Sequence, residues 1–239
     1  MALTGLVLHA SRCGSTLVLR ALETWPGVAV VDEPLALDDA LTAVRKGGDP
    51  AAVTAVLTEL GETGDRVIVK TDAWHVLELP RLLAAAGGVP WLFVHRDPAE
   101  ILVSHAAAPG SHTVPGVLDE VWFGPPRSFH PLPHAAAVLG AIFSAAATHA
   151  SAQQLLGHAE LPAALTVRAA GHFGLDPAEC DVAALDSVLG RHAKHPHLAY
   201  EDDRPGKRAA VTPVIADLVA TEVGPAYRDL LRRAGRVAA

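Results

Sequence analysis

The sequence predicts an α/β fold in which a central parallel β-sheet is covered by helices on both faces, giving three layers. Short β-rich runs alternate with helical patterns over residues 1–107. The predicted strands are apolar along nearly their whole length, as strands buried on both faces are. Of the 239 residues, 50% are hydrophobic and 19% are charged, which is a globular composition that suits one domain over 1–239.

The N-terminal part of the chain is expected to supply the sheet. Strands are predicted at 6–9, 28–31, 66–70 and 91–95, where apolar residues run together. Helices are predicted where apolar residues recur at helical spacing, at 15–25, 35–45, 51–60, 73–86 and 98–107. Ligands of open parallel sheets bind beyond the carboxyl ends of the strands. The residues that follow each strand are therefore the candidates for a site.

The remainder of the chain changes in character. Residues 109–133 are rich in proline, glycine, histidine and aromatic residues, and a loop of this length inside a compact domain is usually functional or disordered. We expect it to help line a pocket, with His112, Trp122, Phe123 and His130 available. Helices are predicted at 135–154, 162–173 and 213–233, and a polar segment at 192–207.

Charge, cysteine content and hydropathy narrow the class of partner and the compartment. The net charge of −7 argues against a nucleic-acid partner, so an anionic ligand would need a local basic site. Cys13 and Cys180 form no CxxC pair, and the N-terminus does not resemble a signal peptide, which predicts a cytoplasmic protein. The longest apolar stretch, 134–150, contains Ser144 and Thr148 and predicts a buried helix, not a membrane span.

The first predicted strand leads into a loop that suits an anion. His9 is followed by Ala-Ser-Arg-Cys-Gly-Ser-Thr over residues 10–16, and a helix begins there. The N–H groups of a first helical turn point at such a ligand, and Gly14 lets the backbone approach it closely. Arg12 adds a fixed charge and a planar donor group. The Gly14–Ser15 step lacks the lysine of a Walker A motif, and an ordinary strand-to-helix turn is the alternative.

The fourth predicted strand ends at a second candidate position. Asp97 is a good N-cap, Pro98 suits the first helical position, and Glu100 is expected to complete a capping box. Arg96 then lies at the ligand edge of the sheet, with Ser104 two turns into the helix. Taken alone, Arg96 could be a surface cation and Ser104 a plain helix serine.

Together these motifs resemble those of the sulfotransferases that use 3′-phosphoadenosine-5′-phosphosulfate (PAPS). The loop Ser-Arg-Cys-Gly-Ser-Thr-Leu at 11–17 resembles the 5′-phosphosulfate loop of that family, and Arg96 with Ser104 has the Arg-x7-Ser spacing that grips the 3′-phosphate. Lys70 ends the third strand, where the family often has a lysine near the transferred group. Residues 158–162, His-Ala-Glu-Leu-Pro, resemble a degraded Tyr-Glu-x-Leu stretch. The resemblance extends from residue 5 to about 230.

The resemblance implies a P-loop NTPase-like sulfotransferase fold, PAPS as donor and 3′,5′-ADP as product, with no metal required. It implies donor contacts from Arg12, Cys13, Gly14, Ser15, Thr16, Arg96 and Ser104, and from Lys207 and Arg208 in a late loop that closes over the nucleotide. Lys70 and Arg12 would stabilise the leaving group, and the acceptor would be a small molecule that the sequence does not identify. The oligomeric state stays open.

The catalytic base departs from the cytosolic branch of the family. That branch has Lys-Thr-His, whereas this chain reads Lys70-Thr71-Asp72. This chain resembles the bacterial branches more closely, because they have a glutamate followed by a proline after the second strand. Glu33 and Pro34 occupy that place here. We therefore expect Glu33 to be the general base, at the N-cap of a helix that begins at Pro34. Asp72, expected to be a helix N-cap, is the second candidate and His75 the third.

Two rival functions and one metal hypothesis stay open. A P-loop kinase would use Mg-ATP, and the missing Walker lysine counts against it. A non-catalytic nucleotide-binding protein is favoured by the missing histidine of Lys-Thr-His. His192, His195 and His197 are close in sequence, but no cysteine is nearby to complete a zinc site, so a solvated polar segment is the preferred interpretation.

Overall fold

The computed structural model of this protein describes residues 3–192, 195–199, 202–233 and 235. The strands of its main sheet are β1 (Leu3–His9), β2 (Val28–Asp32), β3 (Arg66–Lys70), β4 (Trp91–His95) and β5 (Leu155–Gly157). They lie in the order β2-β3-β1-β4-β5, and every neighbouring pair is parallel. The predicted α/β class with a central parallel sheet is confirmed.

Helices cover both faces of this sheet. The α-helices are α1 (Ser15–Leu22), α2 (Leu35–Arg45), α3 (Ala51–Gly61), α4 (Leu79–Ala85), α5 (Pro98–Ala107), α6 (Glu120–Phe123), α7 (Pro131–His149), α8 (Ala170–His172), α9 (Val182–Leu189), α10 (Arg204–Ala209), α11 (Pro213–Leu218) and α12 (Gly224–Arg233). Short 3-10 or π segments are η1 (Ala73–Glu78), η2 (Ser111–Thr113), η3 (His158–Glu160), η4 (Leu165–Ala169), η5 (Pro177–Glu179) and η6 (Val219–Val223). A small hairpin is formed by β6 (Arg191–His192) and β7 (His195–Ala199).

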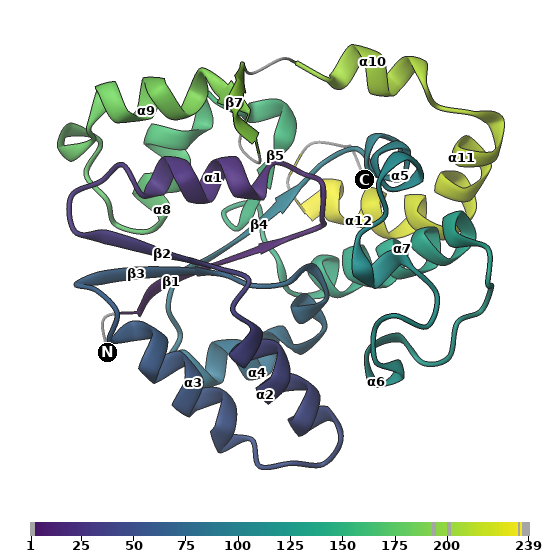
Figure 1. Ribbon diagram of the computed structural model, residues 1–239, viewed down its shortest axis with the longest axis horizontal. Helices are drawn as coiled ribbons and strands as arrows, with labels where there is room; N and C mark the ends of the chain where they lie inside the picture. The colour runs from purple at the N-terminus through teal and green to yellow at the C-terminus, as the bar shows by residue number, and fades with distance from the viewer. Residues whose placement is uncertain (1–2, 193–194, 200–201, 234, 236–239) are drawn as a thin grey trace.

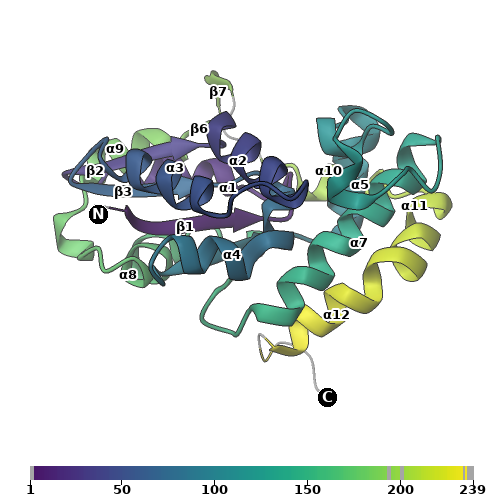
Figure 2. The same ribbon diagram turned by 90° about the horizontal axis from the view of Figure 1, so that it is seen from below.

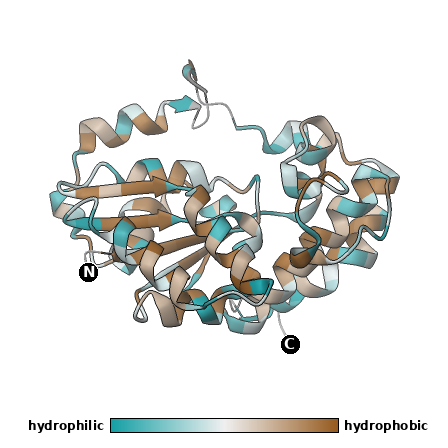
Figure 3. Ribbon diagram, turned by 60° about the horizontal axis from the view of Figure 1, so that its bottom comes forward, coloured by the Kyte–Doolittle hydropathy of each residue, from teal (hydrophilic) through white to brown (hydrophobic). Residues whose placement is uncertain are grey.

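The two faces of the sheet bury two separate apolar clusters. Figure 1 shows α1, α8 and α9 on one side of the sheet, and α2, α3 and α4 on the other. Val7, Ile68 and Val94 point into the first cluster, whereas Leu6, Val69 and Phe93 point into the second. Successive side chains of a strand point to opposite faces, so strands buried on both sides are apolar throughout. Figure 3 shows this concentration of hydrophobic residues along the strands.

The topology places a crevice beside β1. The connection from β1 to β2 passes over one face through α1, whereas the connections that leave β3 and β4 pass over the other face. Parallel crossovers are right-handed, so strands whose connections run in opposite directions send their helices to opposite faces. Such a switch point opens a crevice at the carboxyl ends of the strands. The loop that follows β1 therefore lies at the place where this fold class binds ligands.

Several predicted boundaries differ from the structure. The single helix predicted at 73–86 is a 3-10 segment, η1, followed by α4, with Pro80 in the first turn of α4. Pro80 has no N–H to continue the hydrogen bonding of the preceding segment. The helix predicted at 15–25 ends at Leu22. The helix predicted at 135–154 spans Pro131–His149, and it can begin at Pro131 because proline is tolerated in the first turn of a helix. The helices predicted at 162–173 and 213–233 contain the π segments η4 and η6.

The prediction also missed short elements. The strand β5 has only three residues, and α9 and the β6–β7 hairpin lie in regions where no regular element was predicted. The segment 109–133, predicted as a loop, contains η2 and α6.

One helix, α7, is long and apolar enough by length and composition to cross a membrane, among the residues that the structure describes. Half of its most apolar window is buried inside the protein. It packs against α5 and α12, and Figure 2 shows α12 running alongside it. This packing is that of the buried helix that the sequence predicts.

We expect Gly140→Ala to destabilise the fold, because a Cβ at Gly140 would lie 2.5 Å from the carbonyl oxygen of Glu222 in η6. Backbone must then shift between α7 and the C-terminal helices, at a cost of about 1–3 kcal/mol in the free energy of unfolding. Denaturant unfolding measures this. Gly171→Ala is the matched control, because a Cβ at Gly171 meets nothing within 4 Å. Equal stability of the two variants would contradict the prediction.

Candidate functional site

A cavity of about 740 Å³ opens at the carboxyl ends of the strands, where the topology places the crevice. The residues that the sequence predicts for a donor site line this cavity together, although they come from separate parts of the chain. They are Arg12, Cys13, Gly14, Ser15, Thr16, Glu33, Lys70, Arg96, Ser104 and Lys207. Arg208 is not among the lining residues. Its side chain is 69% exposed and pairs with Glu100, 2.9 Å away.

The loop after β1 takes a conformation typical of anion-binding loops. Ser11 and Arg12 have positive φ angles of 63° and 48°, and Gly14, the N-cap of α1, has a φ of 88°. Non-glycine residues adopt this left-handed region at a cost, and they do so mainly at functional sites. Successive N–H groups in such a loop form a concave surface that attracts an anion. Gly14 has a second constraint, because a Cβ would lie 2.9 Å from Cδ2 of His158.

Three contacts fix the shape of this loop. The Cys13 thiol, fully buried, donates to the carbonyl of Val94 at 3.1 Å. The Ser11 N–H donates to Nδ1 of His9 at 3.0 Å. The Arg12 guanidinium donates to the carbonyl of Ala108, at the end of α5. The loop is therefore held by β1, β4 and the end of α5.

Lys70 lies between two carboxylates at the edge of the sheet, those of Asp32 and Glu33. Its ammonium, 3% exposed, lies 2.9 Å from Oε1 of Glu33 and 2.5 Å from Oδ1 of Asp32. Burial lowers the pKa of Lys70, but the charge of Glu33 and the bond to Asp32 raise it above its ordinary value. Lys70 is therefore a permanent cation that faces the cavity, as the sequence predicts.

Glu33 lies beside Lys70 in a strained conformation. Its φ is 48°, and its N–H donates to the carbonyl of Lys70 at 2.8 Å. The prediction that Glu33 is a helix N-cap is wrong. Pro34 is the N-cap of α2 and the helix begins at Leu35. Burial raises the pKa of Glu33, but the hydrogen bond from His9 and the charge of Lys70 outweigh it and lower the pKa to about 2.

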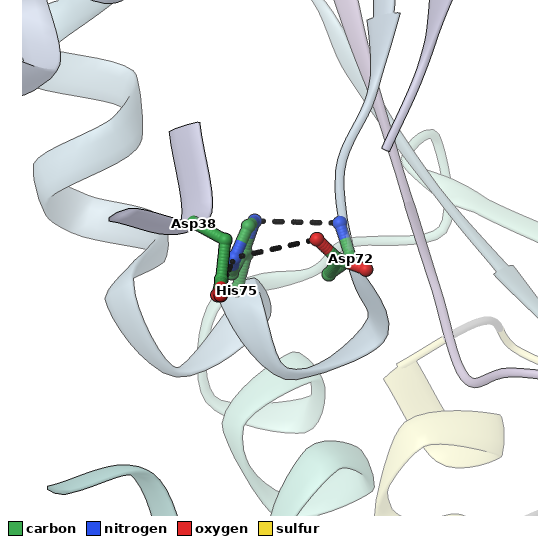
Figure 4. Close-up of side chains that lie close together, drawn as sticks. All are labelled: Asp38, Asp72 and His75. Atoms are coloured by element: carbon green, nitrogen blue, oxygen red, sulfur yellow. Dashed lines mark hydrogen bonds and ion pairs between the residues drawn. The ribbon is translucent and has the colours of Figure 1, made fainter. Parts of the chain in front are cut away.

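Asp72 and His75 form a separate carboxylate–histidine group with Asp38 (Figure 4). Asp72 is the N-cap of η1, as predicted, and its backbone N–H donates to Nδ1 of His75 at 3.3 Å. Nε2 of His75 is 2.9 Å from Oδ1 of Asp38. Both ring nitrogens of His75 are thus engaged inside the fold, so neither offers a lone pair to a metal or a substrate.

The surroundings of Asp72 shift its pKa in the opposite direction from that of Glu33. Burial, with the charges of Glu33 and Asp38, raises the pKa of Asp72 to about 7. Burial also lowers the pKa of His75, which keeps its ring neutral. Asp72 lines the cavity, whereas His75 is fully buried. Glu33 and Asp72 are therefore two carboxylates of the cavity whose pKa values are far apart.

Arg96 is held by carboxylates on two sides. Its Nε donates to Glu100 at 2.6 Å and its Nη2 to Asp203 at 2.6 Å, and Asp203 also accepts from Lys207 at 2.7 Å. The predicted capping box is wrong, because the Glu100 carboxylate turns to Arg96 and Arg208 instead of the start of α5. Asp97 does cap α5, accepting from the N–H of Ala99 at 2.8 Å.

The far wall of the cavity is apolar and aromatic. Trp74 and His112 line it with ring centroids 5.4 Å apart, and Leu198 of β7 lies on it as well. Burial and the neighbouring His105 lower the pKa of His112 to about 3, so its ring is neutral. The segment 109–133 contributes through Gly110, Ser111 and His112, not through Trp122, whose indole is buried and donates to Thr42 at 3.0 Å.

The predicted histidine group of the polar segment is only partly within the described residues. The side chains of His192 and His195 lie outside them, whereas His197 is described on the exposed strand β7.

Among the polar and aromatic residues of the cavity, sequence reasoning did not assign a role to His9, Trp74 or Asp203, and it gave His158 only as part of a motif. His9 directly follows an apolar strand run at the ligand edge, and that position was a signal that could have found it. Asp203 carried no such signal, because its contact with Arg96 joins residues that are far apart in the chain.

No protein-family model matches this chain, and no curated protein resembles it closely enough in sequence to count as a relative.

We expect Asp72→Asn to stabilise the protein above pH 7. Because the pKa of Asp72 is raised to about 7, the folded protein binds this proton more tightly than the unfolded chain. Stability then falls as pH rises from about 4, the ordinary Asp value, through 7. Asparagine caps equally well and removes this slope, for a gain of about 1–3 kcal/mol at pH 8. Thermal unfolding at pH 5 and pH 8 measures it.

Asp97→Asn is the control for this prediction, because Asp97 is also an N-cap but is exposed to solvent. A pH dependence that is the same in wild type and Asp72→Asn would contradict the assignment.

Proposed function

We propose that this protein is a sulfotransferase that moves a sulfuryl group from PAPS to a hydroxyl group of a small-molecule acceptor and releases 3′,5′-ADP. The observation that carries the proposal is the meeting of the loop at 11–16, Lys70 and Arg96 on one cavity. The resemblance of these motifs to the family gives the same donor, and their spatial convergence supports it.

The two ends of the donor have separate partners in this proposal. The 5′-phosphosulfate binds the left-handed loop and the first turn of α1, with Arg12, Ser15 and Thr16 as side-chain donors. The 3′-phosphate binds Arg96 with Ser104 and Lys207. Lys70 lies between the loop and Glu33, with its Nζ 3.5 Å from Oγ1 of Thr16, where it can stabilise charge on the bridging oxygen.

The proposed step is an in-line displacement at sulfur. The acceptor oxygen forms a new bond to sulfur while the bond from sulfur to the phosphate oxygen breaks, and the electron pair leaves with 3′,5′-ADP. Glu33 takes the proton of the acceptor hydroxyl. As in loose phosphoryl transfer, positioning and electrostatic stabilisation supply most of the rate enhancement.

Whether Glu33 or Asp72 is the better base depends on whether Lys70 is paired with Glu33. With a pKa of about 2, Glu33 is ionised but weakly basic while Lys70 is paired with it. When Lys70 turns to the donor, that pairing weakens and the proton affinity of Glu33 increases. Asp72, with a pKa of about 7, is the second candidate. His75 is a poorer candidate, because both of its ring nitrogens are engaged.

A kinase is the rival enzyme class, and the two predict different ligands. Thermal unfolding with 3′,5′-ADP, 5′-AMP and Mg-ATP separates them. A ligand at a hundred times its Kd stabilises the folded state by about 2.7 kcal/mol, or about 5–10 °C for a chain of this size. We expect the large shift with 3′,5′-ADP. A shift with Mg-ATP alone would favour the kinase.

We expect Arg96→Lys to weaken 3′,5′-ADP binding by about 10- to 100-fold while 5′-AMP binding changes by less than about 3-fold, because lysine keeps the charge but loses the planar donor pair. Lysine is preferred to alanine, since Glu100 is also buried and would be left without Arg96. Isothermal titration calorimetry measures both ligands. An equal loss of affinity for the two ligands would show that Arg96 does not bind the 3′-phosphate.

We expect Glu33→Gln to lower kcat for sulfuryl transfer by about 10²- to 10⁴-fold, because glutamine cannot accept the proton. Binding of 3′,5′-ADP should stay within about 3-fold. The matched control is Asp32→Asn, which also removes a carboxylate from Lys70 but does not line the cavity. Full activity of Glu33→Gln would transfer the role of base to Asp72.

We expect Asp203→Asn to strengthen 3′,5′-ADP binding by roughly 10-fold, because the Asp203 carboxylate occupies the donors of Arg96 and Lys207 that the 3′-phosphate needs. The neighbouring Asp202→Asn is the control, since Asp202 pairs with Arg204 instead. Weaker binding by Asp203→Asn would show that Asp203 holds Arg96 in place for the nucleotide.

A further inference from the structure

His9 joins three strand ends at the floor of the cavity. It is the last residue of β1, it is 5% exposed, and it lines the cavity. Its Nδ1 is 3.0 Å from the Ser11 nitrogen, and its Nε2 is 3.0 Å from the carbonyl oxygen of Thr71. The same Nε2 is 3.2 Å from Oε1 of Glu33. One imidazole ring thus contacts the anion loop, the end of β3 and the proposed base.

These contacts determine which nitrogen of His9 carries the proton. The Ser11 N–H is a donor, so Nδ1 must accept and is unprotonated. The carbonyl of Thr71 can only accept, so Nε2 must carry the hydrogen. Burial lowers the pKa of His9, but its hydrogen bonds with Cys13 and Glu33 raise it above the ordinary value. When the ring is neutral it is the Nε2–H tautomer, with both nitrogens occupied. His9 therefore has no lone pair with which to deprotonate an acceptor, and any role in the reaction acts through its neighbours.

We propose that His9 is a positioning residue for Glu33, an inference that rests on the proposed function of Glu33 as base. His9 Nε2 and Lys70 Nζ both approach the same atom of the Glu33 carboxylate, Oε1. Two donors on one oxygen fix the rotation of the carboxylate and direct Oε2 away from them. Oε2 is then the atom that accepts the proton of the acceptor hydroxyl.

His9 also links the base to the donor loop. Ser11 has a φ of 63°, and its N–H is held in that left-handed turn by Nδ1 of His9. The two contacts of His9 are made by different ring nitrogens, so they can be tested separately with amide side chains that reproduce one contact at a time. Asparagine places an acceptor oxygen near Nδ1, whereas glutamine places a donor nitrogen near Nε2.

The groups that act on the charge of Glu33 come from several elements. Lys70 on β3 and His9 on β1 stabilise the carboxylate, and burial opposes them. Asp72, His75 and His112 also interact with the charge of Glu33. His9 acts on Glu33 through its hydrogen bond and through its charge, and its charge also acts on Asp72, His75 and His112. A variant that restores the hydrogen bond without the charge therefore separates the two effects.

The first experiment uses the wild-type protein. Nitrogen-15 NMR of labelled histidine, assigned with His9→Gln, follows the ring of His9 from pH 7 upward, because its pKa is raised. We expect the neutral ring to carry its proton on Nε2 and none on Nδ1. A neutral ring with its proton on Nδ1 would overturn the proposal without any assay of activity.

The second experiment compares His9→Asn with His9→Gln. Carbon-13 NMR of the glutamate carboxyls, assigned with Glu33→Gln, follows the titration of Glu33. In His9→Asn the lost donor should raise the pKa of Glu33 above about 2, shift the acid limb of the kcat profile to higher pH and lower kcat by about 10- to 100-fold. Its affinity for 3′,5′-ADP should stay within about 3-fold.

His9→Gln should show the reverse pattern. Its amide donor should restore kcat and the Glu33 titration, whereas 3′,5′-ADP binding should weaken because the Ser11 N–H has lost its acceptor. Equal losses of every readout in both variants would mean that His9 only fills space, and would overturn the proposal. If wild type transfers no sulfuryl group but Glu33 titrates higher in His9→Asn, the contact with Glu33 stands and the proposed function alone fails.

Discussion

The arrangement of this site depends on a buried lysine. Lys70 ends an apolar strand, and its ammonium is almost fully removed from solvent. A buried charge is costly unless it is paired, so the fold must bring carboxylates to it. Asp32 ends β2, the strand that pairs with β3, Glu33 follows it, and both reach the ammonium. The tight turn at Glu33, with its left-handed backbone, is the conformation that lets two consecutive carboxylates face the same cation.

The same pairing of charges extends around the cavity. Arg96 faces Glu100 and Asp203, and Lys207 faces Asp203, so each of these cations is paired with a carboxylate. This arrangement reconciles a basic site with a chain of net charge −7. In the proposed function, an anionic ligand exchanges places with the carboxylates that hold Arg96 and Lys207, whereas Arg12, which donates to the carbonyl of Ala108, meets the ligand without displacing a carboxylate. Selectivity at Arg96 and Lys207 then follows from how well the geometry of the ligand replaces that of the carboxylates.

Much of the fold could be predicted because the strands are buried on both faces, which makes 66–70 and 91–95 distinct as apolar runs. The third residue of β5 is a glycine and the strand is too short for a pattern, so it was missed. In the site, Lys70 and Arg96 could be predicted because one ends a strand and the other directly follows one, and Arg12 because it lies in the short loop between β1 and α1. The partners Asp203 and His158 could not, because their places depend on how the C-terminal part of the chain packs over the sheet.

The approach of His158 to Gly14 has a consequence for how the protein acquires its site. The loop after β1 is specified by neighbours in the first hundred or so residues, but the surface that closes over it comes from residues near 158 and 203. Contacts of such large sequence separation form late, after the entropy of closing long loops has been overcome. A chain whose C-terminal third has opened would keep its parallel sheet and yet have lost one side of the cavity. Ligand affinity is therefore a measure of how completely the whole polypeptide has folded.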